Sequence, residues 1–392
     1  MNIPISKTFL KENEIKSVLN PLRSGWIVQG PYTKDFEDQW SKFTNIEHSI
    51  AVSSCTAGLE LSLAALGIGA GDEIIIPAFT WISTANVIEH LGAKVVFCDI
   101  NLDTFNIDYK ELEKKITSRT KGLIPIHLFG LAVDMDKIKY IQKKFNLFIV
   151  EDAACGFGSY FKNKHVGSFG DTGCFSFHPR KAITTGEGGM VTTNNRKLAK
   201  KIRNMRDHGA SETDLTRHHG PQPYILADHK YAGYNFRMTD IQGILGLYQM
   251  KRAQKISEER KKLATVYDNK LKNINWIDTP RFENHFIHGY QSYPCILNKK
   301  NINLKNISKF NNKRNDLMKF LFSKGISTRP ATHAVHMLSF YKNKYKIKKN
   351  DYPNAYIAND VSFSLPLYNG LKIKEINYIV KTINDYASYE HQ

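Results

Sequence analysis

The 392-residue sequence has few cysteines and no long uncharged apolar run. No stretch of eighteen or more uncharged apolar residues occurs, so a transmembrane helix is not expected. Residues Met1–Thr8 lack the apolar core of a signal peptide. The five cysteines are odd in number and show no C-x-x-C spacing, which favours reduced thiols. We therefore expect a cytoplasmic protein with no membrane association and no metal site.

Acidic residues are also scarce. Lysine and arginine number 55 against 37 aspartates and glutamates, and the formal net charge is +18. Such an excess makes nucleic-acid binding one hypothesis. The lysines are spread over segments such as 110–121 and 298–324, without an RNA-binding aromatic motif, zinc finger or helix-turn-helix pattern. We expect no nucleic-acid partner, because the charge also suits a solvated surface or the attraction of a phosphorylated or carboxylated substrate.

Short β-rich runs alternate with helical patterns between about residues 48 and 195. Several runs are nearly continuous in Val, Ile and Phe, as expected for strands buried on both faces. Amphipathic stretches at 56–66 and 81–91 lie between them. The alternation predicts an α/β fold with a largely parallel sheet covered by helices. The seven predicted strands are 48–54, 72–79, 93–100, 122–128, 147–154, 173–177 and 189–193.

The pattern changes after residue 235, and the chain length predicts two domains. We expect a large domain over 13–245 and a smaller α+β domain over 246–392. Residues 209–230 contain glycine, proline and histidine and predict a loop of the kind that serves as a lid or interface arm. The other predicted elements are a long helix at 238–260 or on to 271, a strand at 290–297, and helices at 311–324 and 373–386.

Two residues carry the candidate chemistry. Lys181 lies on a loop after a strand, 29 residues beyond Asp152, which ends an apolar strand. The pair suits pyridoxal phosphate (PLP), since a lysine amine can bond to its aldehyde and a carboxylate can keep its pyridine nitrogen protonated. The alternative for Asp152 is a structural ion pair. Glu151 and Asp152 point to opposite faces of the strand, and alternation alone does not choose between them.

The loops after the predicted strands offer further groups, where ligands of parallel sheets bind. Ser53–Ala57 opens a helix, and its N–H groups and hydroxyls can form an anion cup. A plain helix cap is the alternative. Ser176, before Lys181, can also bind phosphate. Trp81 can stack on a pyridine ring, or can be an ordinary core aromatic.

Seven short motifs occur in order along almost the whole chain: 24–31, 52–57, 69–81, 151–154, 176–181, 186–189 and 233–240. Together they resemble the motifs of the DegT/StrS-type sugar aminotransferases. The resemblance implies the type I fold of PLP-dependent transferases, with a mainly parallel seven-stranded sheet in a large domain and a smaller α+β domain. It implies that Lys181 and Asp152 are catalytic. The implied cofactor-binding residues are Thr56, Ala57, Trp81, Asp152, Cys155, Ser176, Lys181 and Asn235.

The resemblance also implies a homodimer with shared active sites. Asn235 would reach the cofactor phosphate of the partner subunit, and Arg237 would help to bind an amino-donor carboxylate. Without the family, Asn235 reads as a helix cap and Arg237 as a surface charge. His333, in an unusual segment at 328–336, is a candidate substrate residue or an ordinary loop histidine.

Two departures and one match refine the resemblance. Cys55 stands where the family usually has glycine. Cys155 stands where the family usually has His or Gln against the ring hydroxyl, and a thiol is the weaker donor. Lys181 argues against the branch of the family in which histidine replaces the lysine and the enzyme is a dehydratase.

The sequence therefore predicts an aminotransferase. Glutamate would donate the amino group, and a keto or aldehyde sugar, most often nucleotide-linked and used for surface polysaccharide, would accept it. An acidic keto sugar without a nucleotide, such as an oxidised octulosonate of lipopolysaccharide, stays open as the acceptor. A non-catalytic regulator with this fold is the alternative from another class, but an intact lysine, aspartate and phosphate cup would be surplus to a binding role.

Overall fold

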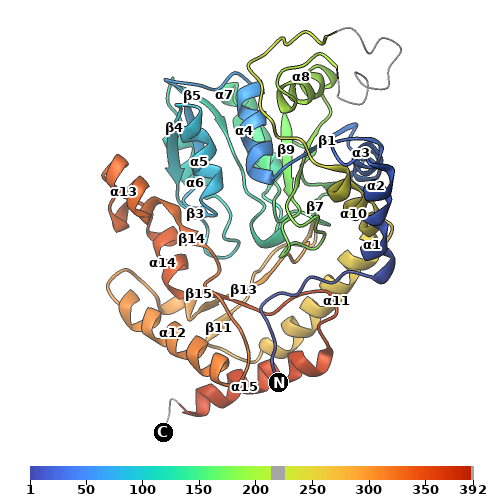
Figure 1. The fold of residues 1–392 in the computed structure, drawn as a ribbon. Helices are drawn as coiled ribbons and strands as arrows, with labels where there is room; N and C mark the ends of the chain where they lie inside the picture. Colours follow the sequence, from blue (N-terminus) through green and yellow to red (C-terminus); the bar gives the residue numbers. More distant parts are fainter. Residues whose placement is uncertain (213–225, 390–392) are drawn as a thin grey trace.

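The computed structural model describes residues 1–212 and 226–389 (Figure 1). Most of the predicted loop at 209–230 lies outside the described residues. All seven predicted strands are confirmed, each within a few residues of its expected bounds, and together they form one sheet. They are β1 (His48–Val52), β2 (Glu73–Pro77), β4 (Lys94–Cys98), β5 (Thr120–Leu123), β6 (Phe148–Asp152), β9 (Thr172–Ser176) and β10 (Gly189–Thr193).

The sheet has the order β1-β10-β9-β6-β5-β2-β4. Strands β9, β6, β5, β2 and β4 run parallel to one another, whereas β10 runs antiparallel to both β1 and β9. The prediction of a mainly parallel seven-stranded sheet is confirmed. The carboxyl ends of β6 and β9 lie side by side, with Asp152 opposite Cys174.

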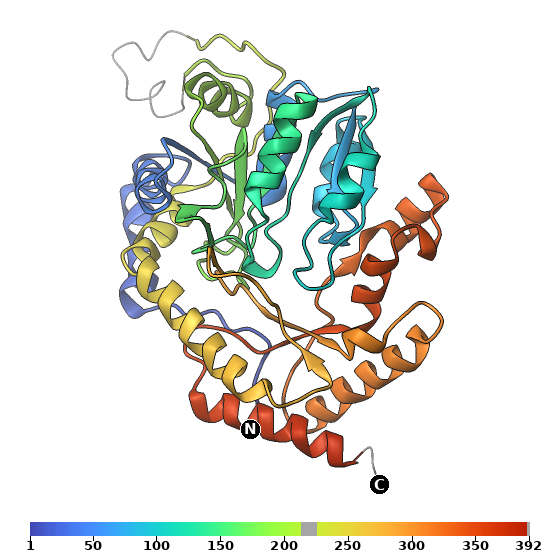
Figure 2. The ribbon, with the colours of Figure 1, turned by 180° about the vertical axis from the view of Figure 1, so that it is seen from behind.

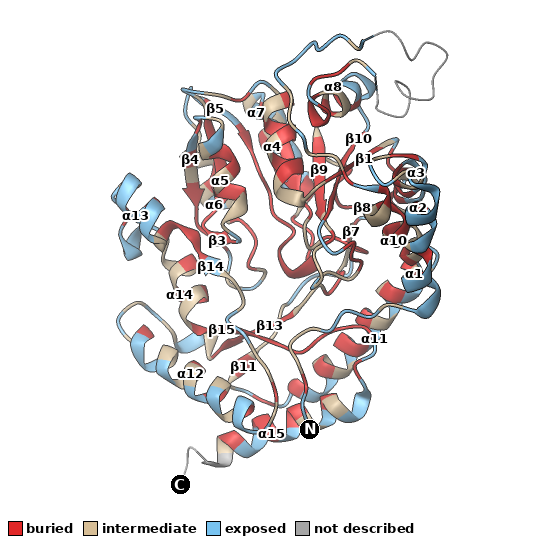
Figure 3. Cartoon of the chain, in the orientation of Figure 1, coloured by how far each residue is buried: buried red, intermediate tan, exposed pale blue. Residues whose placement is uncertain are grey.

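Helices cover both faces of the sheet (Figures 1 and 2). Along β2, Ile74 and Ile76 enter one core cluster and Ile75 enters the other, as strand alternation requires. The first cluster includes α4 (Cys55–Ala65), α5 (Ser83–His90) and α8 (Arg196–Arg206); the second includes α3 (Pro31–Thr44) and α7 (Met135–Phe145). The strands are mostly buried, with exposed residues near the first positions of β4, β5 and β6, which explains their largely apolar sequences (Figure 3).

The single long helix predicted over 238–260 is wrong. The structure has α10 (Asp240–Met250) and α11 (Ala253–Leu271), separated at Lys251 and Arg252. The guanidinium of Arg252 bonds to the buried carboxylate of Glu14 at 3.0 Å and to the Phe9 carbonyl at 2.7 Å. These contacts with the N-terminal segment hold the chain in a non-helical turn.

The smaller part of the molecule is an α+β layer around a separate core cluster. Its antiparallel sheet has the order β11 (Ile277–Asp278), β13 (Tyr293–Leu297) and β15 (Ser362–Leu365). The helices α11, α12 (Ile307–Ser323) and α15 (Ile373–Tyr389) pack beside it, so the predicted strand and helices after residue 290 are confirmed. Ile3 pairs with Ile326, which places the N-terminal segment in this part.

A short ladder joins the two parts. Strand β14 (His333–Ala334) pairs with β3 (Phe79–Thr80), with His333 opposite Thr80.

None of the helices in residues 1–212 and 226–389 has both the length and the apolar character needed to cross a bilayer. The shorter elements are α1 (Glu12–Ser17), α2 (Leu19–Ser24), α6 (Tyr109–Leu112), α13 (Ser339–Tyr345), α14 (Pro353–Val361), β7 (Tyr160–Phe161), β8 (Lys164–His165) and β12 (Phe286–Ile287).

Candidate active site

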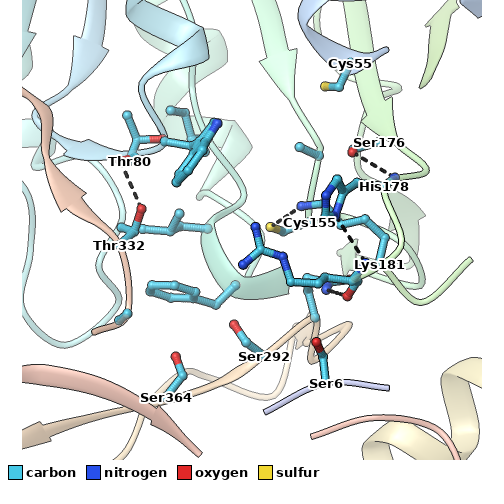
Figure 4. Close-up of a pocket in the computed structure, with 18 of the residues that line it drawn as sticks. Ser6, Cys55, Thr80, Cys155, Ser176, His178, Lys181, Ser292, Thr332 and Ser364 are labelled. Carbon is cyan, nitrogen blue, oxygen red and sulfur yellow. Dashed lines mark hydrogen bonds between the residues drawn. The ribbon is translucent and has the colours of Figure 1, made fainter. Parts of the chain in front are cut away.

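A cavity of about 590 Å³ opens between the carboxyl ends of the large sheet and the smaller part of the molecule (Figure 4). Both parts contribute to its wall, as do Ile5 and Ser6 of the N-terminal segment. Most of the predicted site residues meet here although they are far apart in sequence. Those that line the cavity are Thr56, Trp81, Asp152, Cys155, Ser176, Lys181 and His333.

Lys181 lies on the loop after β9, and its amine points into the cavity. Its Nζ donates to Sγ of Cys155 at 3.3 Å (Figure 4). Gln291 supports this loop, since its side chain accepts from the Ala182 N–H at 3.2 Å and donates to the Arg180 carbonyl at 2.7 Å. The lysine therefore extends from an anchored backbone into a space that a small molecule can enter.

Asp152 is the carboxylate that faces the cavity. Its side chain is 5% exposed. One oxygen accepts the hydroxyl of Thr84 at 2.6 Å, and the other accepts the N–H of Ala154 at 3.0 Å. These two bonds fix the orientation of the carboxylate, and each oxygen keeps a lone pair that can accept from an N–H donor in the cavity.

Glu151 points to the opposite side of β6 and is fully buried. It accepts from His127 Nε2 at 2.9 Å and from three backbone N–H groups of the turn before β9, those of Gly167, Phe169 and Gly170. Burial opposes ionisation of Glu151, but the hydrogen bonds from His127 and the backbone outweigh it and hold its pKa below the ordinary value. Glu151 is thus a structural acid.

The start of α4 was predicted as an anion cup, and its backbone lies at the edge of the cavity. Ser54 is a plain helix cap, because its hydroxyl accepts the N–H of Ala57 at 3.0 Å. In the described residues, no backbone hydrogen bond uses the first-turn N–H groups of Cys55 and Thr56. The hydroxyls of Thr56 and Ser176 line the same space. Ala57 itself does not line the cavity, and its predicted phosphate contact stays a prediction.

Glycine is required beside this cup. A Cβ on Gly189 would lie 2.6 Å from the nitrogen of Cys55, so β10 can approach the start of α4 only without a side chain.

Burial raises the pKa of the Cys55 thiol well above its ordinary value, and the neighbouring Asp152 carboxylate adds to the effect. The thiol that replaces the family's glycine is therefore held neutral.

Trp81 stands at the mouth of the cavity. Its side chain is 55% exposed, so the interpretation as a core aromatic is wrong. Its indole contacts the imidazole of His333, with ring centroids 5.6 Å apart. The indole thus has room for a flat ligand beside it.

Asn235 and Arg237 lie elsewhere. The described lining of the cavity includes neither residue. Asn235 forms a backbone bridge with Asp207, whose carboxylate is ion-paired with Arg237. The α10 helix is capped by Thr239, so the interpretation of Asn235 as a helix cap is wrong. Their predicted action across a dimer is compatible with a place outside this chain's own cavity, and it stays a prediction.

Three important neighbours were not predicted as site residues. Arg180 and Arg329 line the cavity, and Thr84 binds Asp152. The position of Arg180 next to Lys181, and that of Arg329 in the segment with His333, were available signals. Nothing in the sequence around Thr84 points to a carboxylate 68 residues away.

The residues present fit PLP. The cavity has an amine in Lys181, a carboxylate in Asp152 and an N-terminal helix turn with free N–H groups for a phosphate. These three groups match the aldehyde, the pyridine nitrogen and the phosphate of the cofactor. The exposed indole of Trp81 matches the flat ring between them.

Comparisons with known proteins agree with this geometry. The model of the DegT/DnrJ/EryC1/StrS aminotransferase family matches residues 8–384. The chain is 34% identical over 384 residues to the spore coat polysaccharide biosynthesis protein SpsC of Bacillus subtilis, covering 98% of this chain and 96% of that protein.

Solved structures give the same result. A proposed sugar aminotransferase from Streptococcus pneumoniae in its PMP form is 32% identical, with a TM-score of 0.88 over 97% of this chain and 98% of that chain. Its PLP form is also matched. Helicobacter pylori PseC, an aminotransferase involved in the biosynthesis of pseudoaminic acid, is 27% identical, with a TM-score of 0.88 over 98% of this chain and 99% of that chain.

Proposed function

The chain belongs to the DegT/DnrJ/EryC1/StrS aminotransferase family and is a PLP-dependent sugar aminotransferase; from this premise we propose that it moves an amino group from glutamate to a nucleotide-linked keto or aldehyde sugar used for surface polysaccharide. The observation that carries the proposal is the convergence of Lys181, Asp152 and the anion cup in one cavity. The similarity to SpsC, a spore coat polysaccharide biosynthesis protein, supports a role in the synthesis of surface polysaccharide.

Each residue has a distinct task in the proposed reaction. When bound, PLP supplies an aldehyde that takes up the amino group and a ring that accepts electrons. Lys181 would hold the cofactor and, with its Nζ free, would carry a proton between the cofactor carbon and the substrate carbon. Asp152 would hold a proton at the ring nitrogen. Thr56 and Ser176 would bind the phosphate through their hydroxyls, and Trp81 would cover one face of the ring.

We also propose that the active unit is a homodimer with shared sites. The first two helices and the loop after them expose a row of large apolar side chains, each 41–51% accessible: Ile15, Leu19, Leu22, Ile27 and Val28. Exposed large apolar side chains close together in the chain are typical of an interface. A second copy docked there is our choice of occupant, because Asn235 and Arg237 lie outside this chain's own cavity. Sedimentation of the purified protein should give a dimer mass.

A specific observation keeps the acidic, nucleotide-free keto sugar as a second candidate. Arg180, Arg329 and His333 line the cavity beside the site of Lys181. A guanidinium can bind a carboxylate through two parallel hydrogen bonds. The same side chains also suit a diphosphate, so the two acceptor classes must be compared directly.

The test begins with PLP-loaded protein and glutamate. The visible absorbance should shift to that of the aminated cofactor, and Lys181→Ala should show no such shift. A panel of nucleotide-linked keto sugars and free keto-sugar acids is then added to the aminated protein. Return of the original spectrum with the nucleotide sugars supports the proposal, and return with the free acids alone replaces it by the second candidate. If the absorbance does not respond to glutamate or to any other amino donor, the alternative of a non-catalytic regulator with this fold is favoured.

A further inference from the structure

Thr84 makes a contact that the proposed mechanism does not yet use. It lies in the first turn of α5 and is completely buried. Its hydroxyl donates to Oδ2 of Asp152 at 2.6 Å. Hydrogen bonds from a hydroxyl to a carboxylate are short and roughly twice as strong as neutral ones, and this distance is in that class.

The hydroxyl is not used for its own helix. Serine and threonine at a helix start commonly bind a free N–H of the first turn. The N-cap of α5 is Ile82, which makes no side-chain cap bond, and the Thr84 hydroxyl turns to β6 instead. The amino end of α5 also carries the positive end of the helix dipole, which favours an anion beside it. Both features act on Asp152.

Each carboxylate oxygen of Asp152 accepts a hydrogen bond from a different donor. Oδ2 receives the Thr84 hydroxyl, and Oδ1 receives the Ala154 N–H at 3.0 Å. These bonds hold the carboxylate plane from both sides, and each oxygen keeps a lone pair for a donor in the cavity. Because Asp152 is only 5% exposed, little water can replace a lost donor.

We propose that Thr84 is a positioning residue for this aminotransferase. Its hydroxyl orients the Asp152 carboxylate, so that Asp152 can accept a hydrogen bond from the ring nitrogen of the bound cofactor. Trp81 precedes it by three residues, so one segment supplies both the ring platform and the support for the acid. The inference rests on the proposed function of Asp152.

The experiment compares two variants of Thr84, one that keeps the shape of the side chain and one that keeps its hydroxyl. Thr84→Val keeps the branched shape and removes the hydroxyl; Thr84→Ser keeps the hydroxyl and removes the methyl. Rapid mixing with glutamate measures kcat and KM of the first half-reaction, cofactor titration of the unloaded protein measures Kd, and thermal melting reports folding. Asp152→Ala is measured in parallel.

We expect Thr84→Val to lower kcat by ~10–100-fold, the range for loss of a hydrogen bond to a charged group, with KM for glutamate little changed. Its cofactor Kd should rise several-fold. Thr84→Ser should retain kcat within ~3-fold, since the serine hydroxyl can still donate its hydrogen bond to Asp152. Both variants should melt as folded proteins.

Two results would overturn the inference. One is a normal kcat in Thr84→Val; the other is an equal loss in the Val and Ser variants, which would assign the effect to packing of α5. If Thr84→Val is normal while Asp152→Ala is inactive, only the role of Thr84 fails. If Asp152→Ala retains turnover, the proposed role of Asp152 itself fails.

Discussion

Two adjacent carboxylates on β6 should respond to amide substitution in opposite ways. Glu151 is fully buried and accepts four hydrogen bonds, two on each oxygen. In Glu151→Gln, one oxygen is replaced by an NH₂ group. Whichever way the amide turns, two N–H donors then face another donor. We expect this variant to lose stability rather than chemistry.

The size of the loss follows from the contacts. His127 cannot relieve the conflict by changing tautomer, because its Nδ1 accepts the Val133 N–H at 3.1 Å and its Nε2 must therefore donate to Glu151. Two lost hydrogen bonds to a charged group, at ~1.5–3 kcal/mol each, give a destabilisation of ~3–6 kcal/mol. With an unfolding entropy of about 2.1 cal/mol/K per residue, the midpoint of thermal unfolding of the 392-residue chain should fall by about 4–7 °C.

Calorimetry and urea unfolding across pH give the assay. Because the pKa of Glu151 is lower in the folded than in the unfolded chain, its contribution is complete above the unfolded value and is lost as pH falls through the folded one. The difference in unfolding free energy between wild type and Glu151→Gln should therefore be constant near neutral pH and shrink at acidic pH. A difference under ~1 kcal/mol at pH 7 would refute the reasoning, since it is below one charged hydrogen bond.

Asp152→Asn is the matched control. Thr84 can turn its hydroxyl from donor to acceptor toward the new amide, so the structure is satisfied and stability should change by less than ~1 kcal/mol. Turnover should nevertheless be lost, because an amide cannot hold the ring nitrogen protonated. Full turnover in Asp152→Asn would exclude this role for the carboxylate.

The remaining predictions concern the cofactor and the dimer. Borohydride reduction of the loaded protein followed by peptide mapping should place the cofactor on Lys181, and a label on any other lysine would contradict the site. Mixing inactive Lys181→Ala with inactive Asn235→Ala should restore some activity, since one site of each heterodimer is intact; proven subunit exchange without recovery would count against shared sites. Cys155→Ser should change cofactor affinity, measured by titration, less than about tenfold, because a thiol is a poor donor and contributes no more than an ordinary hydrogen bond of ~1 kcal/mol. A larger loss would reveal a chemical role for the thiol.

Much of the fold could be predicted because its signals are local. A strand buried on both faces, such as Glu73–Pro77, must be apolar along its length and is visible in a single window of sequence. The loop with Lys181 and the helix start at Cys55–Ala57 are likewise contiguous motifs. The choice of Asp152 over Glu151 came from the family resemblance, since strand alternation places the two on opposite faces without saying which face holds the cavity.

Other features depended on contacts between distant segments, and only the tertiary structure decided them. The helix predicted at 238–260 is interrupted at Arg252, whose side chain binds Glu14, 238 residues earlier. Arg329 lines the cavity and forms a backbone bridge with Ser364 of β15, and Thr84 meets Asp152 because α5 packs against the neighbouring strands. Helical periodicity and motif spacing describe a residue's own neighbourhood, whereas these partners are set by how the elements pack.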